Sequence, residues 1–187
     1  MNRQSQRGFT LVEVMMVVVI IAVLSTLAIV YMKPTTKPVD VATRFGNLVE
    51  EANRTAVRLG VVRADVATAQ GSKRRTRITA TNTPVTFSLE VLSEDPTPTW
   101  TTVETYRVPT QVTPVGFVKL VGTHAVLSAT PGLTTNWSTL QVSCFPNGTC
   151  DAATLFFSST KGPTRDQQAR VSVLPLGSSS YVINAWN

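Results

Sequence analysis

The chain has 187 residues, 43% of them hydrophobic, and a formal net charge of +6. This length is of single-domain size once any membrane segment or leader is set aside, so one globular core is expected. The charge is only a mild basic bias, because removal of Arg3 and Arg7 with a leader would leave 15 basic and 11 acidic residues, a net charge of +4.

A long apolar segment runs from Phe9 to Met32, 24 residues that contain one formal charge, Glu13. At about 1.5 Å rise per residue, a helix of this length reaches about 36 Å, enough to cross a hydrocarbon core of about 30 Å. Arg3 and Arg7 precede it without an acidic residue, which predicts a cytoplasmic N-terminus and an external C-terminal region. An ordinary secretory signal peptide is the alternative, but Thr26-Leu27-Ala28 is a poor small-x-small cleavage site.

The junction before the apolar segment reads Arg7-Gly8-Phe9-Thr10-Leu11-Val12-Glu13. It resembles the signal of type IV pilins and type II secretion pseudopilins, in which a basic leader ending in glycine precedes Phe-Thr-Leu-Val/Ile-Glu and a hydrophobic helix. The resemblance implies cleavage after Gly8 by a membrane prepilin peptidase, on the cytoplasmic side, and N-methylation of Phe9. A glycine suits the cleavage site because, without a Cβ, its backbone can approach a protease closely. The hydrophobic helix would remain on the mature protein.

Glu13 is the residue that a purely structural interpretation explains worst. A lone carboxylate inside a membrane helix costs several kcal/mol unless it is paired, and is therefore a functional candidate. The resemblance implies that its partner in the assembled filament is the α-amino group of Phe9 of a neighbouring subunit. The alternative is a carboxylate close enough to the membrane surface to stay hydrated.

A second, amphipathic helix is predicted after the apolar segment. Pro34 and Pro38 predict a kink or short break, and Asp40 is the expected N-cap. Apolar residues then recur at steps of three and four up to Gly60, which is expected to end the helix. The stripe consists of Val41, Phe45, Leu48, Val49, Ala52, Ala56 and Leu59, and the opposite face carries Arg44, Asn47, Glu51, Arg54 and Arg58. We expect the stripe to pack against a sheet as part of the core.

The rest of the chain is predicted to be rich in strands, because it is rich in Thr, Ser, Val and Pro. The expected strands are 76–80, 85–92, 100–108, 115–121, 125–128, 139–145, 154–158, 170–174 and 181–185. They indicate one antiparallel sheet, or two packed sheets, against the amphipathic helix. The predicted fold class is α+β, with a long N-terminal helix, half transmembrane and half amphipathic, packed on an antiparallel β-sheet domain. The expected boundaries are 1–8 for the leader, 9–32 for the transmembrane helix, 33–60 for the link and amphipathic half, and 61–187 for the β-rich domain.

Cys144 and Cys150 flank Phe-Pro-Asn-Gly-Thr, a strong turn sequence between two expected strands. A local disulfide that closes this hairpin is expected, with free thiols as the alternative, and it agrees with a periplasmic location. A zinc site is disfavoured because the chain has no further cysteine and one histidine, His124.

The densest basic run is Lys73, Arg74, Arg75 and Arg77, which follows Gly71 and Ser72. A solvated loop is the expected structure, and contact with an anionic partner such as nucleic acid is the alternative. No catalytic constellation is visible, so we expect neither an enzyme nor a cofactor. Ser93-Glu94-Asp95 is a weak candidate for calcium because no wider ligand pattern surrounds it.

Residues 44–60, with Leu48-Val-Glu-Glu-Ala-Asn-Arg54 at their centre, resemble the second half of the first helix of H-type minor pseudopilins and FimU/FimT-like minor pilins. Residues 155–162, 170–174 and 181–187 are loosely similar to the closing strands of those proteins. The resemblance implies a minor subunit near the tip of a type IV pilus or a type II secretion pseudopilus, which helps to initiate assembly. A major pilin and a DNA-binding minor pilin remain alternatives, although the Gly-Arg-x-Arg motif of the latter is absent.

The implied partners are other pilins or pseudopilins, the prepilin peptidase and an inner-membrane assembly platform; a nucleic acid is not expected. The implied location is the bacterial inner membrane, with the C-terminal domain in the periplasm, followed by the filament.

Overall fold

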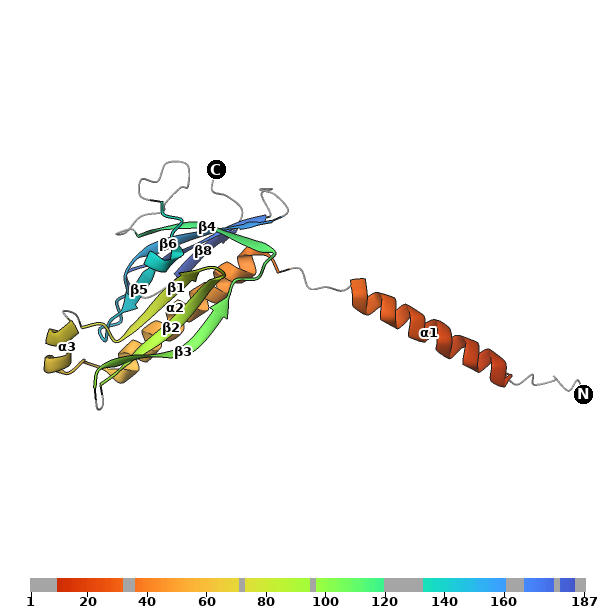
Figure 1. The fold of residues 1–187 in the computed structure, drawn as a ribbon, viewed down its shortest axis with the longest axis horizontal. Helices are drawn as coiled ribbons and strands as arrows, with labels where there is room; N and C mark the ends of the chain where they lie inside the picture. The colour runs from red at the N-terminus through yellow and green to blue at the C-terminus, as the bar shows by residue number, and fades with distance from the viewer. Residues whose placement is uncertain are drawn as a thin grey trace, which may run out of the picture. The chain divides into compact units, whose positions relative to one another are not determined.

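The structure is a computed structural model that describes residues 10–31, 36–70, 73–94, 97–119, 133–160, 167–176 and 179–183. The chain divides into two compact units, residues 1–35 and 36–187 (Figure 1). The amphipathic helix therefore shares a unit with the strands. The predicted break at Pro34 lies outside the described residues.

Helix α1 (Leu11–Tyr31) is the described element of the first unit. Thr10 caps it, because the Thr10 Oγ1 accepts a hydrogen bond from the backbone N–H of Glu13 at 3.3 Å. Apolar side chains surround this helix on every side, and those of residues 11–27 are exposed. A helix that is apolar all round needs an apolar environment, either lipid or other helices.

Helix α2 (Pro38–Leu59) begins at Pro38, three residues before the first helical position expected from an N-cap at Asp40. The N-cap is Lys37, whose backbone N–H donates to the Asp40 Oδ2 at 2.8 Å. The N-cap prediction was wrong because a proline in the first position starts a helix without losing a hydrogen bond. Gly60 ends the helix as predicted, with a φ of +70° that favours glycine.

The apolar stripe of α2 is buried as predicted, except for its last residue. Its buried members are Val41, Phe45, Leu48, Val49, Ala52 and Ala56. Leu59 lies in the final turn and is 39% exposed. The helix contacts strands of two sheets, so the stripe joins both to one core.

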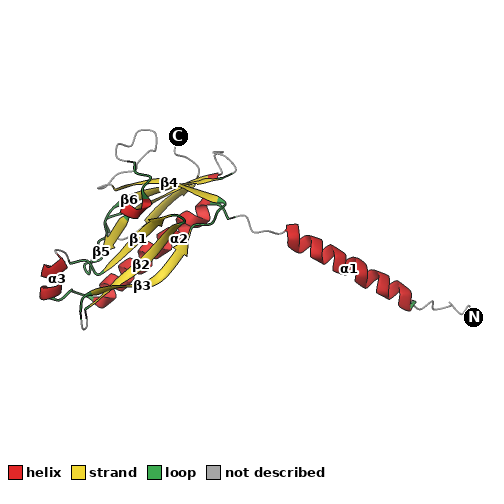
Figure 2. Ribbon diagram, in the orientation of Figure 1, coloured by secondary structure: helices red, strands yellow, loops and turns green. Residues whose placement is uncertain are grey.

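Within the described ranges, eight strands form two four-stranded antiparallel sheets (Figure 2), one of the two arrangements expected. The first sheet has the order β3-β2-β1-β5, with β1 Thr76–Asn82, β2 Val85–Ser93, β3 Thr99–Arg107 and β5 Gln141–Cys144. The second has the order β4-β6-β7-β8, with β4 Val112–Lys119, β6 Ala153–Ser159, β7 Gln168–Val173 and β8 Ser179–Ile183. The predicted α+β class is confirmed. The expected strand 125–128 lies outside the described residues.

A cluster of aromatic rings fills the core between α2 and the two sheets. The Phe45 ring of α2 meets the Phe87 ring of β2 edge to face, with centroids 4.9 Å apart. Trp137 contacts Phe87, Phe117 of β4 and Phe157 of β6, so rings from both sheets meet at one indole. Aromatic pairs of this kind contribute beyond their buried area, and they tie the layers of the domain together.

Two short helices were not predicted, α3 (Ala64–Gln70) and the 3₁₀ helix η2 (Trp137–Thr139). Val62, just before α3, and Val66, within it, bury against Leu92 and the half-buried Trp100 in a small separate cluster. Helix α3 has only seven residues, and the surrounding composition favours strands. In η2, the buried Trp137 fixes the segment that precedes β5.

Candidate functional site

The N-terminal junction is described from Thr10 to Glu13, while Gly8 and Phe9 lie outside the described residues. The Glu13 backbone N–H also donates to the Thr10 carbonyl at 3.0 Å, so both residues belong to the first turn of α1. The Glu13 side chain is exposed. A carboxylate here interacts favourably with the positive end of the helix dipole.

A shallow apolar groove of about 490 Å³ runs along α1 beside Glu13. It is lined by Val12, Met15, Met16, Val19 and Ile20, a spacing of one, three and four residues that places them on one side of the helix. Methionine side chains adapt to irregular partners. This surface can pack against another apolar helix, and the exposed Glu13 carboxylate can then form an ion pair with one positively charged group.

No helix within the described ranges meets the length and hydropathy criteria for crossing a membrane.

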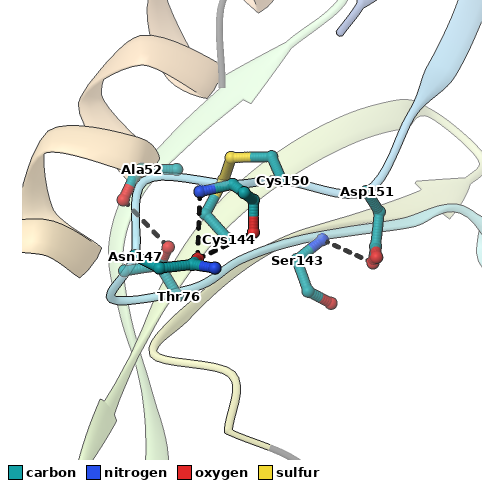
Figure 3. Close-up of a disulfide and its surroundings, with 8 residues drawn as sticks. Ala52, Thr76, Ser143, Cys144, Asn147, Cys150 and Asp151 are labelled. Atoms are coloured by element: carbon teal, nitrogen blue, oxygen red, sulfur yellow. Dashed lines mark hydrogen bonds between the residues drawn. A yellow bond between two sulfur atoms is a disulfide. The ribbon is translucent and has the colours of Figure 1, made fainter. Parts of the chain in front are cut away.

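The expected disulfide between Cys144 and Cys150 is present, at the base of the loop 145–149 (Figure 3). Both cysteines are buried. Within the loop, the Phe145 N–H donates to the Thr149 carbonyl at 2.8 Å, and Gly148 adopts a φ of +81° that a residue with a side chain rarely takes. The Asn147 Oδ1 accepts from both the N–H and the hydroxyl of Thr149, at 3.2 Å and 2.7 Å. We call residues 145–149 the disulfide loop.

Hydrogen bonds hold the base of the disulfide loop to its neighbours. The Cys150 N–H donates to the Pro175 carbonyl at 2.8 Å. Figure 3 shows a second bond, in which the Ser143 N–H donates to the Asp151 Oδ2 at 3.0 Å. Close by, the buried Thr76 hydroxyl donates to the Ala52 carbonyl of α2 at 2.9 Å. The base of the loop is thus fixed to the turn after β7, and the Thr76–Ala52 bond joins the adjacent β1 to α2.

The basic run is not the solvated loop that was expected, because Arg75 and Arg77 have carboxylate partners. Arg75 is buried, pairs with Glu94, and donates through Nη2 to the Leu59 carbonyl at the end of α2, at 3.3 Å. Arg77 pairs with Glu90, its direct neighbour across β1 and β2, and its guanidinium lies 4.2 Å above the Trp100 ring. Sequence reasoning missed both glutamates.

Lys73 is the exposed member of the run, and it has no carboxylate partner among the residues that the structure describes. Two of the four positive charges are thus neutralised inside the chain, at Arg75 and Arg77. The sequence contained a signal for the pairing of Arg77 with Glu90. A hairpin turning at residues 83–84 pairs Asn82 with Val85 and, counted outward, Arg77 with Glu90.

Arg44 of α2 forms an ion pair with Glu104 of β3 on the outer face of the domain. Beside it, burial raises the pKa of Tyr106, an effect that the Arg44 charge opposes and the Asp40 charge reinforces. At the start of α3, the hydrogen bond from Arg63 lowers the pKa of the exposed Asp65. These pairs fix surface side chains and resemble no acid–base site.

The described residues contain no group of three or more His, Cys, Asp and Glu side chains arranged to hold a metal ion. In the weak calcium candidate, Glu94 is engaged by Arg75 and by the Arg63 N–H, which donates to it at 3.1 Å. Asp95 and His124 lie outside the described residues.

Comparison with known proteins supports the N-terminal part of the candidate site. Residues 3–29 match the family described as "Prokaryotic N-terminal methylation motif", which supports the resemblance to type IV pilins and pseudopilins drawn from residues 7–13. A solved structure, the minor pseudopilin EpsH from the Type 2 Secretion System of Vibrio cholerae, is similar with a TM-score of 0.49 and 12% sequence identity. The similarity covers 79% of this chain and 98% of that chain. A search of curated proteins gives no match.

Proposed function

We propose that this chain is a structural subunit of a type IV pilus or type II secretion pseudopilus and acts as a minor pilin or pseudopilin. The match of residues 3–29 to the N-terminal methylation motif carries this proposal. Proteins with such an N-terminus are processed and assembled through it, so the activity we assign is assembly and not catalysis.

The mature subunit is cut after Gly8 by a prepilin peptidase and is methylated at Phe9. The motif match covers both positions. The apolar helix then anchors the subunit in the bacterial inner membrane, with its N-terminus cytoplasmic and its second unit periplasmic. The disulfide between Cys144 and Cys150 supports this side, because disulfides persist in oxidising compartments.

In the filament, Glu13 pairs with the positive α-amino group of Phe9 of a neighbouring subunit. The groove of Val12, Met15, Met16, Val19 and Ile20 supports close helix packing next to Glu13. Packing in a low-dielectric surrounding strengthens the attraction between the two charges, while each charge alone would be costly there. Correct insertion therefore neutralises two charges together.

A minor role that helps to initiate the filament near its tip follows from the resemblance of residues 44–60 to H-type minor pseudopilins. Partners in this role are other pilin-like subunits and an inner-membrane assembly platform. A major subunit is the alternative, and the abundance of the chain in sheared filaments separates the two roles.

A DNA-binding minor pilin is not favoured. Arg75 and Arg77 already pair with Glu94 and Glu90, which leaves fewer cations to neutralise phosphates. A gel shift measured at several salt concentrations tests this alternative.

The test of the assembly role is Glu13→Ala in the native bacterium. We expect normal cleavage, because the substitution lies five residues beyond the cut, together with loss of the subunit from sheared filaments. Glu50→Ala on the exposed face of α2 is the matched control and should leave incorporation unchanged. Normal incorporation of the Glu13→Ala chain would refute the assigned role of Glu13.

A further inference from the structure

A pocket of about 570 Å³ lies beside the disulfide loop, in the second unit. Its lining residues are Val61, Lys73, Phe145, Pro146, Asn147 and Thr149. They come from three places in the sequence: the segment after α2, the segment before β1, and the disulfide loop. The volume is in the range of sites that accept a small molecule or a few side chains of a peptide. We call it the disulfide-loop pocket.

The disulfide loop, which forms one wall of this pocket, is held in place by bonds within the chain. The Cys144–Cys150 disulfide closes the loop, and the bond from the Phe145 N–H to the Thr149 carbonyl braces it. The Gly148 backbone lies against the end of α2, since a Cβ there would be in ordinary van der Waals contact with the Val57 Cγ2, at 3.7 Å. A wall that is already ordered lowers the entropic cost of binding.

The floor of the pocket is apolar and open to solvent. Val61 is 79% exposed and the neighbouring Val57 is 50% exposed. Phe145 and Pro146 are only partly buried. Single exposed apolar residues are common on protein surfaces, but the three that line one hollow, Val61, Phe145 and Pro146, form with Val57 beside them a patch of the kind that marks binding sites.

Two of the polar groups at the rim are hydrogen-bond donors, on Asn147 and Lys73. The Asn147 Oδ1 already accepts two hydrogen bonds from Thr149, which fixes the amide orientation and leaves its NH₂ as the unused group. The exposed Lys73 has no carboxylate partner in the described part of the chain. Two donors, one of them cationic, beside an apolar hollow are complementary to a carboxylate next to an apolar side chain.

We propose that the disulfide-loop pocket is a docking site for an exposed segment of a partner protein that carries an aliphatic or aromatic side chain beside an acidic residue. The apolar side chain fills the space between Val61 and Phe145, and its neighbouring carboxylate accepts from Lys73 and Asn147. Nucleic acid does not fit this site, because one lysine offers little to a phosphate backbone. The inference does not depend on membrane anchoring or on Glu13, since every residue of the pocket lies in the second unit.

The test is a titration of the isotope-labelled full chain, held in lipid nanodiscs, with two capped tripeptides, Leu-Glu-Leu and Leu-Gln-Leu, followed by NMR. We expect saturable shifts of the amides of Val61, Phe145 and Thr149 with Leu-Glu-Leu. The uncharged peptide should bind about two- to fivefold more weakly, the worth of one exposed ion pair. No saturable shift of these amides, or equal affinity for both peptides, would overturn the proposal.

Matched variants test separately the cationic part of the site, at Lys73, and its apolar part, at Val61. Lys73→Ala should weaken Leu-Glu-Leu about two- to fivefold and leave Leu-Gln-Leu unchanged, while the exposed Lys119→Ala should change neither. Val61→Asp should abolish binding of both peptides, whereas Val103→Asp, at another exposed valine, in β3, should bind like the parent chain. If Lys73→Ala behaves like Lys119→Ala, or Val61→Asp like Val103→Asp, the pocket is not the docking site.

Discussion

Arg75 connects four parts of the second unit through one side chain. It pairs with Glu94 at the end of β2, and it donates to the Leu59 carbonyl, one of the last carbonyls of α2 that lack a helical partner. Glu94 in turn accepts from the Arg63 N–H in the segment before α3. The Arg75 and Glu94 side chains are 11% and 17% exposed, so water screens the pair only weakly.

Arg75→Ala should therefore destabilise the domain by about 2–4 kcal/mol, because it leaves the Glu94 charge and the Leu59 carbonyl without their partner. Urea unfolding followed by tryptophan fluorescence measures the change, since Trp137 is buried in the core. Arg54→Ala is the control: Arg54 pairs with Glu50 on the exposed face of α2 and should change the stability by less than about 0.5 kcal/mol. Equal effects of the two substitutions would contradict the role given to Arg75.

Tyr106 gives the domain a dependence on alkaline pH. Burial raises the pKa of its phenol in the folded chain, so the unfolded chain loses the proton first. The stability that this group contributes is present below the ordinary pKa of about 10 and is lost as the pH rises through the folded value.

We expect the free energy of unfolding of the parent chain to fall more than that of Tyr106→Phe between about pH 8 and pH 11. The difference between the two proteins isolates Tyr106 from the lysines, which titrate over the same range. Identical pH profiles would show that Tyr106 is not responsible.

At the residue scale, sequence patterns locate charges but not their partners. The basic run at residues 73–77 is evident in the sequence. The pairing of its Arg77 with Glu90 and of its Arg75 with Glu94 depends on the register of a hairpin. The Arg77–Glu90 pair was recoverable by counting outward from the turn. The Arg75–Glu94 pair was not, because it also depends on where α2 ends and on the position of α3.

At the scale of elements, the disulfide loop is a short covalent ring that joins the two ends of a turn, Cys144 and Cys150. The ring closes over a sequence separation of six residues, a loop that contributes about 2 kcal/mol in the chain-entropy treatment. The loop is also secured by the Cys150 N–H, which donates to the Pro175 carbonyl through an interaction that does not involve the sulfur atoms.

Replacing both cysteines by alanine should lower the free energy of unfolding by about 2 kcal/mol without loss of the fold. Circular dichroism and urea unfolding measure the two quantities. A reductant should not destabilise the double variant further, which serves as the internal control. Unchanged stability of the double variant would mean that the ring does not constrain the unfolded chain.

Periodicity predicted the long elements well and the short ones poorly. The stripe of α2 and most strands follow directly from spacings of three to four and of two residues. Helix α3 has seven residues, too few for a repeat of apolar positions to be recognised. The start of α2 was misplaced because Pro38 was interpreted as a breaker and not as the first residue.

At the scale of the whole molecule, the two units differ in whether the apolar side chains of their helices are exposed or buried. The first exposes apolar side chains along α1, and the second buries its apolar stripe between two sheets. A surface like that of α1 is stable in lipid or in a helix bundle and unfavourable in water. The proposed function gives the two units different tasks, assembly for the first and contact with periplasmic partners for the second.

The mass of the mature chain from its native bacterium tests this account most directly. Intact-mass analysis with sequencing of the N-terminal peptide should find a protein that begins at Phe9 and carries one methyl group on its α-amino nitrogen. It should retain the whole apolar segment up to Met32. A mature chain that begins at Met1, or near Ile29 after an ordinary signal peptide, would contradict the account.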